Sequence, residues 1–171
     1  LLNKPKGFVA TSRKGKKINK TTQDLIQNTI SHETPPVDEM GRTASGLLLL
    51  TNDSALQKKL EDNPKIKMVY HIKLAKPLSA MAKDNLIKGI KIQKKIYPIK
   101  KISYLEGKAK TEIGIEVFGL NSGMLTKLFS KLELSIIYLD RVRLAGFTKK
   151  DLARGQWRYL SKKEISFLKM F

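Results

Sequence analysis

The chain has 171 residues, enough for a domain with a real hydrophobic core, and its net charge is +19. Because 34 Lys and Arg residues face only 15 Asp and Glu residues, a compact state is strained by self-repulsion and a polyanionic partner is expected. The charge is spread along the chain, which favours nucleic acid over a membrane surface. The absence of cysteine excludes disulfides, thiolate catalysis and cysteine-ligated zinc, and with His32 and His71 as the histidines no metal site is expected.

The N-terminal part alternates loops with short elements. Residues 1–12 predict a strand around a Lys-Pro-Lys-Gly turn, and the basic residues 13–20 predict a loop. The pattern at 21–24 is typical of a helix start, and the prolines at 35–36 end that unit. Residues 47–51 form a short apolar run between turn signals, which predicts a buried strand.

The rest of the chain alternates helices and strands. Asp53 or Ser54 is the expected N-cap of a short helix. Further strands are predicted at 67–74, 96–105, 111–118, 136–144 and 156–160. Further helices are predicted at 79–90, from 121 onward and at 162–170. This order favours an α+β fold with a mostly antiparallel central sheet flanked by helices, formed by residues 1–171 as one domain or as two lobes sharing the sheet.

Five segments carry a family resemblance. In chain order they are LLNKPKGFVAT (1–11), SGLLLLTND (45–53), MVYHIKL (68–74), GLN before an amphipathic helix (119–121), and YLDRVRLAGFTKKDLARGQWRYLSKKEI (138–165). In sequence and order the chain resembles the ribosomal branch of the pseudouridine synthases, which isomerise uridines in ribosomal RNA. The resemblance implies the fold of that family, ribosomal RNA as partner, and neither metal nor cofactor.

The chemistry of that family depends on an aspartate that acts on a flipped-out uridine, with an arginine that holds the flipped state and a tyrosine that stacks on the base. The family's loop reads Gly-Arg-Leu-Asp, two variable residues and Thr-Ser-Gly. Aligned on Ser45-Gly46, Gly41 occupies the aspartate position and Glu39 the arginine position. Aligned instead on Gly41-Arg42-Thr43, Ala44 occupies the aspartate position. The carboxylate is missing in both registers, which predicts loss of catalysis.

A second motif also lacks residues that are typical of the family. The family's Asn-Arg-Gln-hydrophobic-Arg-Arg is NSGMLT at residues 121–126, which retains the asparagine and none of the arginines. The alternative prediction is an active enzyme whose carboxylate comes from Asp38, Glu39 or elsewhere. A third class, a scaffold that binds proteins through the old cleft, leaves the positive charge unexplained.

The predicted RNA contacts combine the basic segments with positions from the resemblance. Tyr70 corresponds to the stacking tyrosine, and strand alternation is expected to place Arg141 and Arg143 on one face. The full predicted set is Lys4, Lys6, Arg13, Lys14, Lys16, Lys17, Lys20, Arg42, Tyr70, Arg141 and Arg143. A second candidate patch comprises Lys91, Lys94, Lys95, Lys100 and Lys101.

The predicted function is therefore ribosomal RNA binding, in ribosome assembly or as a structural component of a ribosome. The expected location is the cytoplasm of a bacterium or the matrix of an organelle, with no secretion. The family often carries a small RNA-binding domain before its first strand, and the present sequence does not contain one.

Overall fold

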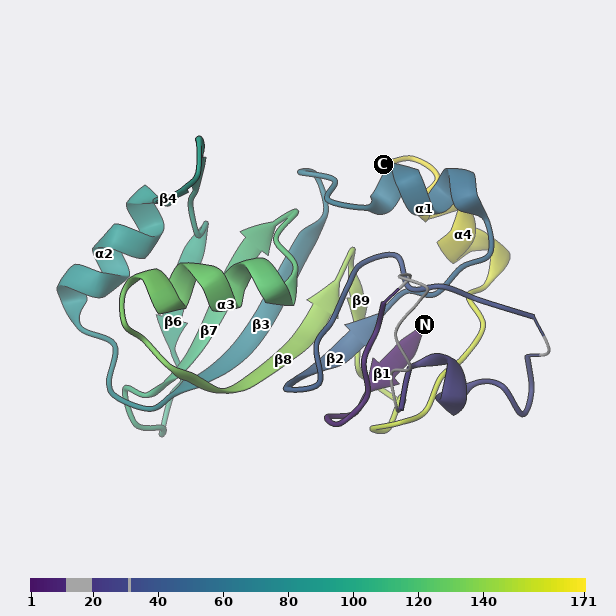
Figure 1. Cartoon of the computed structure of the whole chain (residues 1–171), viewed down its shortest axis with the longest axis horizontal. Coiled ribbons are helices and arrows are strands. Elements are labelled where there is room, and N and C mark those ends of the chain that lie inside the picture. Colours follow the sequence, from purple (N-terminus) through teal and green to yellow (C-terminus); the bar gives the residue numbers. More distant parts are fainter. Residues whose placement is uncertain (12–19, 31) are drawn as a thin grey trace.

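A seven-stranded sheet runs along the computed structural model, which describes residues 1–11, 20–30 and 32–171 (Figure 1). Its strand order is β1-β2-β8-β3-β7-β6, with β9 paired to β8. The strands are β1 (Leu2–Lys4), β2 (Ala44–Leu48), β3 (Lys67–Leu74), β6 (Lys101–Tyr104), β7 (Glu112–Phe118), β8 (Ile136–Leu144) and β9 (Phe147–Thr148). The pair β2–β8 is parallel and the other pairs are antiparallel, so the predicted α+β class with a mostly antiparallel sheet is confirmed.

Helices flank the sheet at both ends of the molecule (Figure 1). They are α1 (Ser54–Leu60), α2 (Ala80–Lys88), α3 (Ser122–Lys131) and α4 (Lys162–Leu168). Each begins at a side chain that accepts a hydrogen bond from a backbone N–H of the first turn, and these N-caps are Asp53, Ser79, Asn121 and Ser161. Each of these boundaries lies within one residue of its predicted start, because the capping residues are visible in the sequence.

The main core lies between α3 and one face of the sheet. Strand β3 buries every second residue (Met68, Tyr70, Ile72 and Leu74) on that face. Leu125, Leu128 and Phe129 of α3 are completely buried there as well. The other face of β3 carries polar side chains, among them His71 and Lys73, which both lie beside the carboxylate of Glu112.

Several predicted elements are wrong in detail. The predicted helix after residue 21 is a single 3-10 turn, Gln23–Leu25, since Asp24 accepts a hydrogen bond from the backbone N–H of Thr21 but Thr22 gives no side-chain cap. Residues 90–97 form a separate hairpin of β4 (Ile90–Ile92) with β5 (Lys95–Tyr97). The strand predicted at 96–105 is therefore interrupted before β6, because Pro98 has no N–H to continue a strand. Residues 156–160 make one isolated bridge, Trp157 with Leu2, as the partner strand β1 is only three residues long.

Strand β2 begins three residues earlier than the apolar run predicts. Ala44, Ser45 and Gly46 belong to it and pair with β8. At Gly46 the backbone φ is +109°, and a Cβ would lie 2.3 Å from the carbonyl oxygen of Arg141. Glycine is therefore required for the two strands to approach here, a demand that only the tertiary pairing makes visible.

Candidate functional site

The segment from Pro36 to Thr43 corresponds to the predicted catalytic loop and leads into β2. It is held at both ends, because Val37 donates to the carbonyl of Leu49 and Met40 exchanges two backbone hydrogen bonds with Ala10. Asp38 and Met40 are buried, whereas Glu39 and Gly41 are exposed. Asp38 is thus directed into the molecule, whereas Gly41 lies at the surface.

Asp38 forms a bidentate ion pair with Arg141 of β8. Its two carboxylate oxygens accept from Nη1 at 2.6 Å and from Nη2 at 2.9 Å. The Nε of Arg141 donates to the carbonyl of Leu47 at 2.7 Å, which fixes the plane of the guanidinium. Arg141 is completely buried, and although burial opposes its charge, Asp38 raises its pKa above the usual value. A bidentate pair of this kind occupies both carboxylate oxygens of Asp38.

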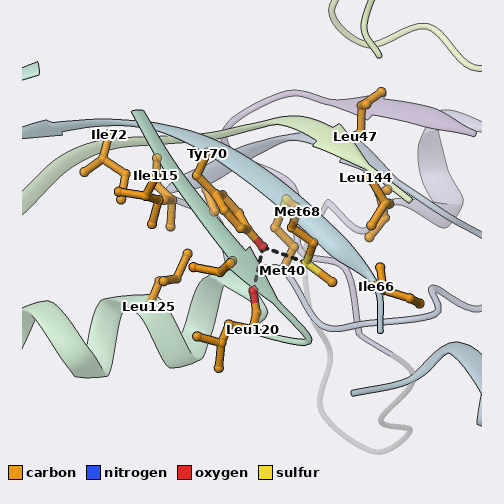
Figure 2. Close-up of a cluster of buried hydrophobic side chains, with 14 of the residues drawn as sticks. Met40, Leu47, Ile66, Met68, Tyr70, Ile72, Ile115, Leu120, Leu125 and Leu144 are labelled. Atoms are coloured by element: carbon orange, nitrogen blue, oxygen red, sulfur yellow. Dashed lines mark hydrogen bonds between the residues drawn. The ribbon is translucent and has the colours of Figure 1, made fainter. Parts of the chain in front are cut away.

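Tyr70 of β3 adjoins this ion pair. Figure 2 shows its ring among buried apolar side chains, with the hydroxyl directed towards Met68 and Leu120. Its hydroxyl donates to the carbonyl of Leu120 at 3.0 Å and accepts from Nη1 of Arg141 at 3.4 Å. The side chain is completely buried beside Met68, and burial raises its pKa to about 12. Both faces of the phenol ring belong to the core, so direct stacking of a base on Tyr70 does not fit this structure.

The fold therefore brings a carboxylate, an arginine and a tyrosine together, but in a closed interior. A cavity beside Asp38, lined also by Asn121 and Met68, measures about 10 Å³. That volume accommodates about one water molecule, while pockets that bind small molecules measure ~300–1,000 Å³. At Gly41, by contrast, a Cβ would meet no atom within 4 Å. Gly41 thus has room for a substrate beside it but no side chain to react, whereas the carboxylate of Asp38 has no room for a substrate.

The substituted NSGMLT motif forms the N-cap and the first turn of α3. Asn121 caps the helix by accepting from the backbone N–H of Met124 at 2.9 Å. Two positions at which the resemblance expects arginine, Ser122 and Leu125, are buried, and the third, Thr126, donates its hydroxyl hydrogen to the carbonyl of Ser122. The retained asparagine has a structural role, and this turn offers no cation to a substrate.

Lys4 is also buried and serves the fold. Its ammonium donates to the carbonyls of Pro5, Phe8 and Ala44 at 3.0, 2.7 and 2.7 Å. Burial lowers the pKa of this amine to about 8. With all three ammonium hydrogens bonded to carbonyls, Lys4 ties the N-terminal turn to β2, and a direct phosphate contact does not fit.

A β-bulge separates the two arginines that were expected to share one face of β8. Tyr70 pairs with Arg141, but Val69 pairs with Arg143, so Val142 is an extra residue in the ladder. Because directly paired residues point to the same side, Arg141 faces the core with Tyr70 and Arg143 faces the opposite side with Val69. The expectation of a shared face is wrong, and Arg143 is exposed.

The remaining predicted RNA contacts divide into surface residues and residues outside the described part of the chain. Lys6 and Lys20 are exposed, with the ammonium of Lys6 lying 4.7 Å from the ring centre of Tyr138. Arg42 is exposed and donates to the carbonyl of Gly7 at 2.9 Å. Arg13, Lys14, Lys16 and Lys17 lie outside the described residues. Lys91, Lys94, Lys95, Lys100 and Lys101 are all exposed.

Sequence reasoning missed a second buried carboxylate, Asp140, on the other side of β8. It accepts from Ser45 at 3.0 Å, from Arg154 at 2.9 Å and from the ammonium of Lys149. Burial alone would raise the pKa of Asp140, but the hydrogen bonds from Arg154 and Lys149 outweigh burial and hold it at about 2. No motif marks this cluster, because its members come together only through the β2–β8 pairing and the turn after β9.

The described ranges contain neither a metal-binding cluster nor a helix that could span a membrane. No group of three or more His, Cys, Asp or Glu residues in residues 1–11, 20–30 and 32–171 is arranged to hold a metal ion. None of the described helices combines the length and the apolar character needed to cross a bilayer.

Comparisons with known proteins agree with the architecture. The profile of the family described as RNA pseudouridylate synthase matches residues 1–118. An uncharacterized RNA pseudouridine synthase of Aquifex aeolicus is 25% identical over 171 residues, covering 99% of this chain and 70% of the relative. The ribosomal large subunit pseudouridine synthase B of Bacillus subtilis is 29% identical over 178 residues, with the same coverage of both chains. A crystal structure of a pseudouridylate synthase superposes with a TM-score of 0.78 at 20% identity, covering 98% of this chain and 71% of the other.

Proposed function

This chain belongs to the RNA pseudouridylate synthase family, and we propose that it binds ribosomal RNA without isomerising uridine. In this proposal it acts in ribosome assembly or as a structural component of a ribosome, in a bacterial cytoplasm or an organellar matrix. The net charge of +19 supports a polyanionic partner. The relative that is named as a ribosomal large subunit pseudouridine synthase makes ribosomal RNA the first RNA to test.

One observation carries the proposal of lost catalysis. Gly41 stands where the resemblance expects the reacting aspartate, and the nearby carboxylate of Asp38 is paired at both oxygens with a buried guanidinium. A carboxylate that attacks or deprotonates a nucleotide must be within bonding distance of it. Reaching Asp38 would require opening the ion pair and exposing two charges in the core, which costs several kcal/mol.

Glu39 does not replace the missing group well. Its side chain is exposed, and its Oε1 accepts from the hydroxyl of Thr11 at 3.2 Å. It lies two positions before Gly41 in the chain, and errors of ~1 Å in the placement of a reacting group already cost about 100-fold in rate. An acid at this surface position also repels phosphate.

A second function, an active synthase that uses Asp38, has one observation in its favour. Asp38, Arg141 and Tyr70 are the same three side-chain types that the family reaction uses, and Arg141 contacts both of the others. In this alternative an RNA-induced opening of the loop at 36–43 would have to separate Asp38 from Arg141 and create space for a base.

The experiment that separates the two functions measures reaction and binding on the same sample. Isomerisation replaces the C5–H bond of uridine by the glycosidic carbon bond, so ribosomal RNA transcribed with uridine tritiated at C5 releases tritium when pseudouridine forms. We expect no release above a protein-free control, with clear binding of the same RNA and an affinity that falls steeply with salt. The Bacillus subtilis relative serves as the active control.

The outcomes are distinct. Tritium release by the purified protein, abolished in Asp38→Asn or Glu39→Gln, would establish the active alternative. Absence of RNA binding at near-physiological salt would reject both functions. Sedimentation of the protein with a ribosomal subunit or precursor is the expected result for the assembly or structural role.

A further inference from the structure

A concave surface that carries two lysines is lined by residues of α3 and of β4. These two elements lie at the end of the molecule opposite α1 and α4 (Figure 1). We call this surface the α3 groove. It is open to solvent and has a volume of about 400 Å³. Its lining residues are Ile92, Thr126, Lys127, Ser130 and Lys131. It is separate from the loop at Gly41 and from the buried Asp38–Arg141 pair, neither of which contributes to its lining.

The spacing of these residues on α3 places them on one exposed side of the helix. Thr126 and Ser130, like Lys127 and Lys131, are four residues apart and so lie one above the other. The opposite side, with Leu125, Leu128 and Phe129, is buried against the sheet. The helix contains no acidic residue.

The two lysines of the groove differ from three lysines on the open face of the sheet. On the open face of the sheet, Lys67, Lys73 and Lys149 lie beside Glu116, Glu112 and Asp140 respectively. Within the described part of the chain, no carboxylate lies within salt-bridge distance of Lys127 or Lys131. Their charge is therefore not neutralised locally, while much of the charge on the sheet face is.

The hairpin extends this positive surface. Lys95 pairs directly with Ile92, and paired residues of an antiparallel ladder point to the same side. Because Ile92 lines the groove, Lys95 lies on the groove side of the hairpin, with its ammonium 5.2 Å from the ring centre of Tyr97. Lys91 pairs with Ile96 and points to the other side of the hairpin.

The polar groups in the groove match the chemistry of a ribose–phosphate backbone. Ammonium groups and the Ser130 hydroxyl donate to phosphate oxygens. The hydroxyl of Thr126 already donates to the carbonyl of Ser122, so its oxygen is left as an acceptor, which suits a ribose 2′-OH. None of the described residues that line the groove is aromatic, so its lining favours the backbone of RNA over a stacked base.

We propose that the α3 groove binds the sugar–phosphate backbone of RNA and is a main anchoring surface of this protein. The proposal rests on the proposed RNA-binding function and identifies where that binding occurs. Such contacts position the RNA without reading its sequence. They also replace, at a different place on α3, the cations that the first turn of the helix lacks.

The test compares two double variants that remove the same charge. Lys127→Gln with Lys131→Gln alters the groove, and Lys162→Gln with Lys163→Gln alters exposed lysines of α4, at the other end of the molecule. Affinity for a ribosomal RNA fragment is measured at several salt concentrations, and thermal unfolding is recorded to verify that each variant is folded. We expect the groove variant to bind about tenfold more weakly and the slope of log K against log salt to fall by about 1.4–1.8, the loss of two phosphate contacts.

Further variants make the result specific. Lys127→Arg with Lys131→Arg is expected to retain the wild-type slope, and Ser130→Glu, which adds an acid to the groove, is expected to weaken binding. Equal slopes and affinities for the groove variant and the α4 variant would overturn the groove while leaving RNA binding intact. If the wild-type protein itself does not bind RNA, the proposed function fails and the groove with it.

Discussion

Replacing Asp38 by asparagine is expected to destabilise the protein strongly, because it leaves the guanidinium of Arg141 buried without its counter-charge. Both side chains are shielded from solvent, with 0% of Arg141 and 8% of Asp38 exposed, and the pair makes two hydrogen bonds at 2.6 and 2.9 Å. Removing one partner of a buried ion pair costs about 3–5 kcal/mol. For a chain of this length, a loss of that size lowers the melting temperature by roughly 6–20 °C.

Urea unfolding monitored by the fluorescence of Trp157 measures this effect directly. Glu39→Gln is the matched control, because it removes the same type of charge from an exposed neighbouring position and is expected to change stability by no more than about 0.5 kcal/mol. An Asp38→Asn variant with an unchanged urea midpoint would refute the structural role of the pair. That result, combined with a loss of tritium release, would instead assign Asp38 to catalysis.

Three other substitutions probe the surroundings. Tyr70→Phe removes the hydrogen bond to the carbonyl of Leu120 and should lower the free energy of unfolding in urea by about 1 kcal/mol. RNA affinity should not change, since the side chain is completely buried, and weaker RNA binding by a stable variant would contradict this. Asp140 has a folded-state pKa of about 2, below the usual 3.8, so the stability it contributes is present above pH 4 and is lost as the pH falls towards 2. This component is about 2 kcal/mol, and Asp140→Asn should show a correspondingly smaller loss of stability over that range; an equal loss would contradict the assignment. Gly46→Ala places a methyl group 2.3 Å from the carbonyl oxygen of Arg141 at a φ of +109°, and should cost at least about 3 kcal/mol or prevent soluble expression; a near-wild-type melting temperature would show that β2 and β8 separate easily.

The elements that were predicted accurately are those with strong local determinants. Strands β3 and β8 have the predicted boundaries because their alternating or apolar patterns are long. The helices begin where Asp53, Ser79 and Asn121 cap them. The β4–β5 hairpin was missed, since three-residue strands have no distinctive period, and the bulge at Val142 was missed because it depends on the pairing with β3.

In the candidate site, too, some features could be predicted from local sequence and others depend on tertiary pairing. Substitution of the aspartate and the arginines could be read from the sequence once the five segments had been aligned with the family. The burial of Lys4, Tyr70 and Arg141 could not be predicted from the sequence. A basic or aromatic residue in a strand has the same local pattern whether it contacts solvent or an interior partner. Their burial follows from the pairing of β1, β2, β3 and β8.

The sequence alone determined the class of fold, the excess of positive charge and the absence of a carboxylate at Gly41, because each is a property of residue identity or of short-range pattern. Only the tertiary structure decided which charges are available to a partner. It pairs Asp38 with Arg141 in the interior and bonds Lys4 to three carbonyls. Lys127 and Lys131 lie in a groove and have no carboxylate partner among the described residues. The physical reason is that the availability of a charge depends on its solvation and its neighbours, and both are set by residues that are distant in the chain.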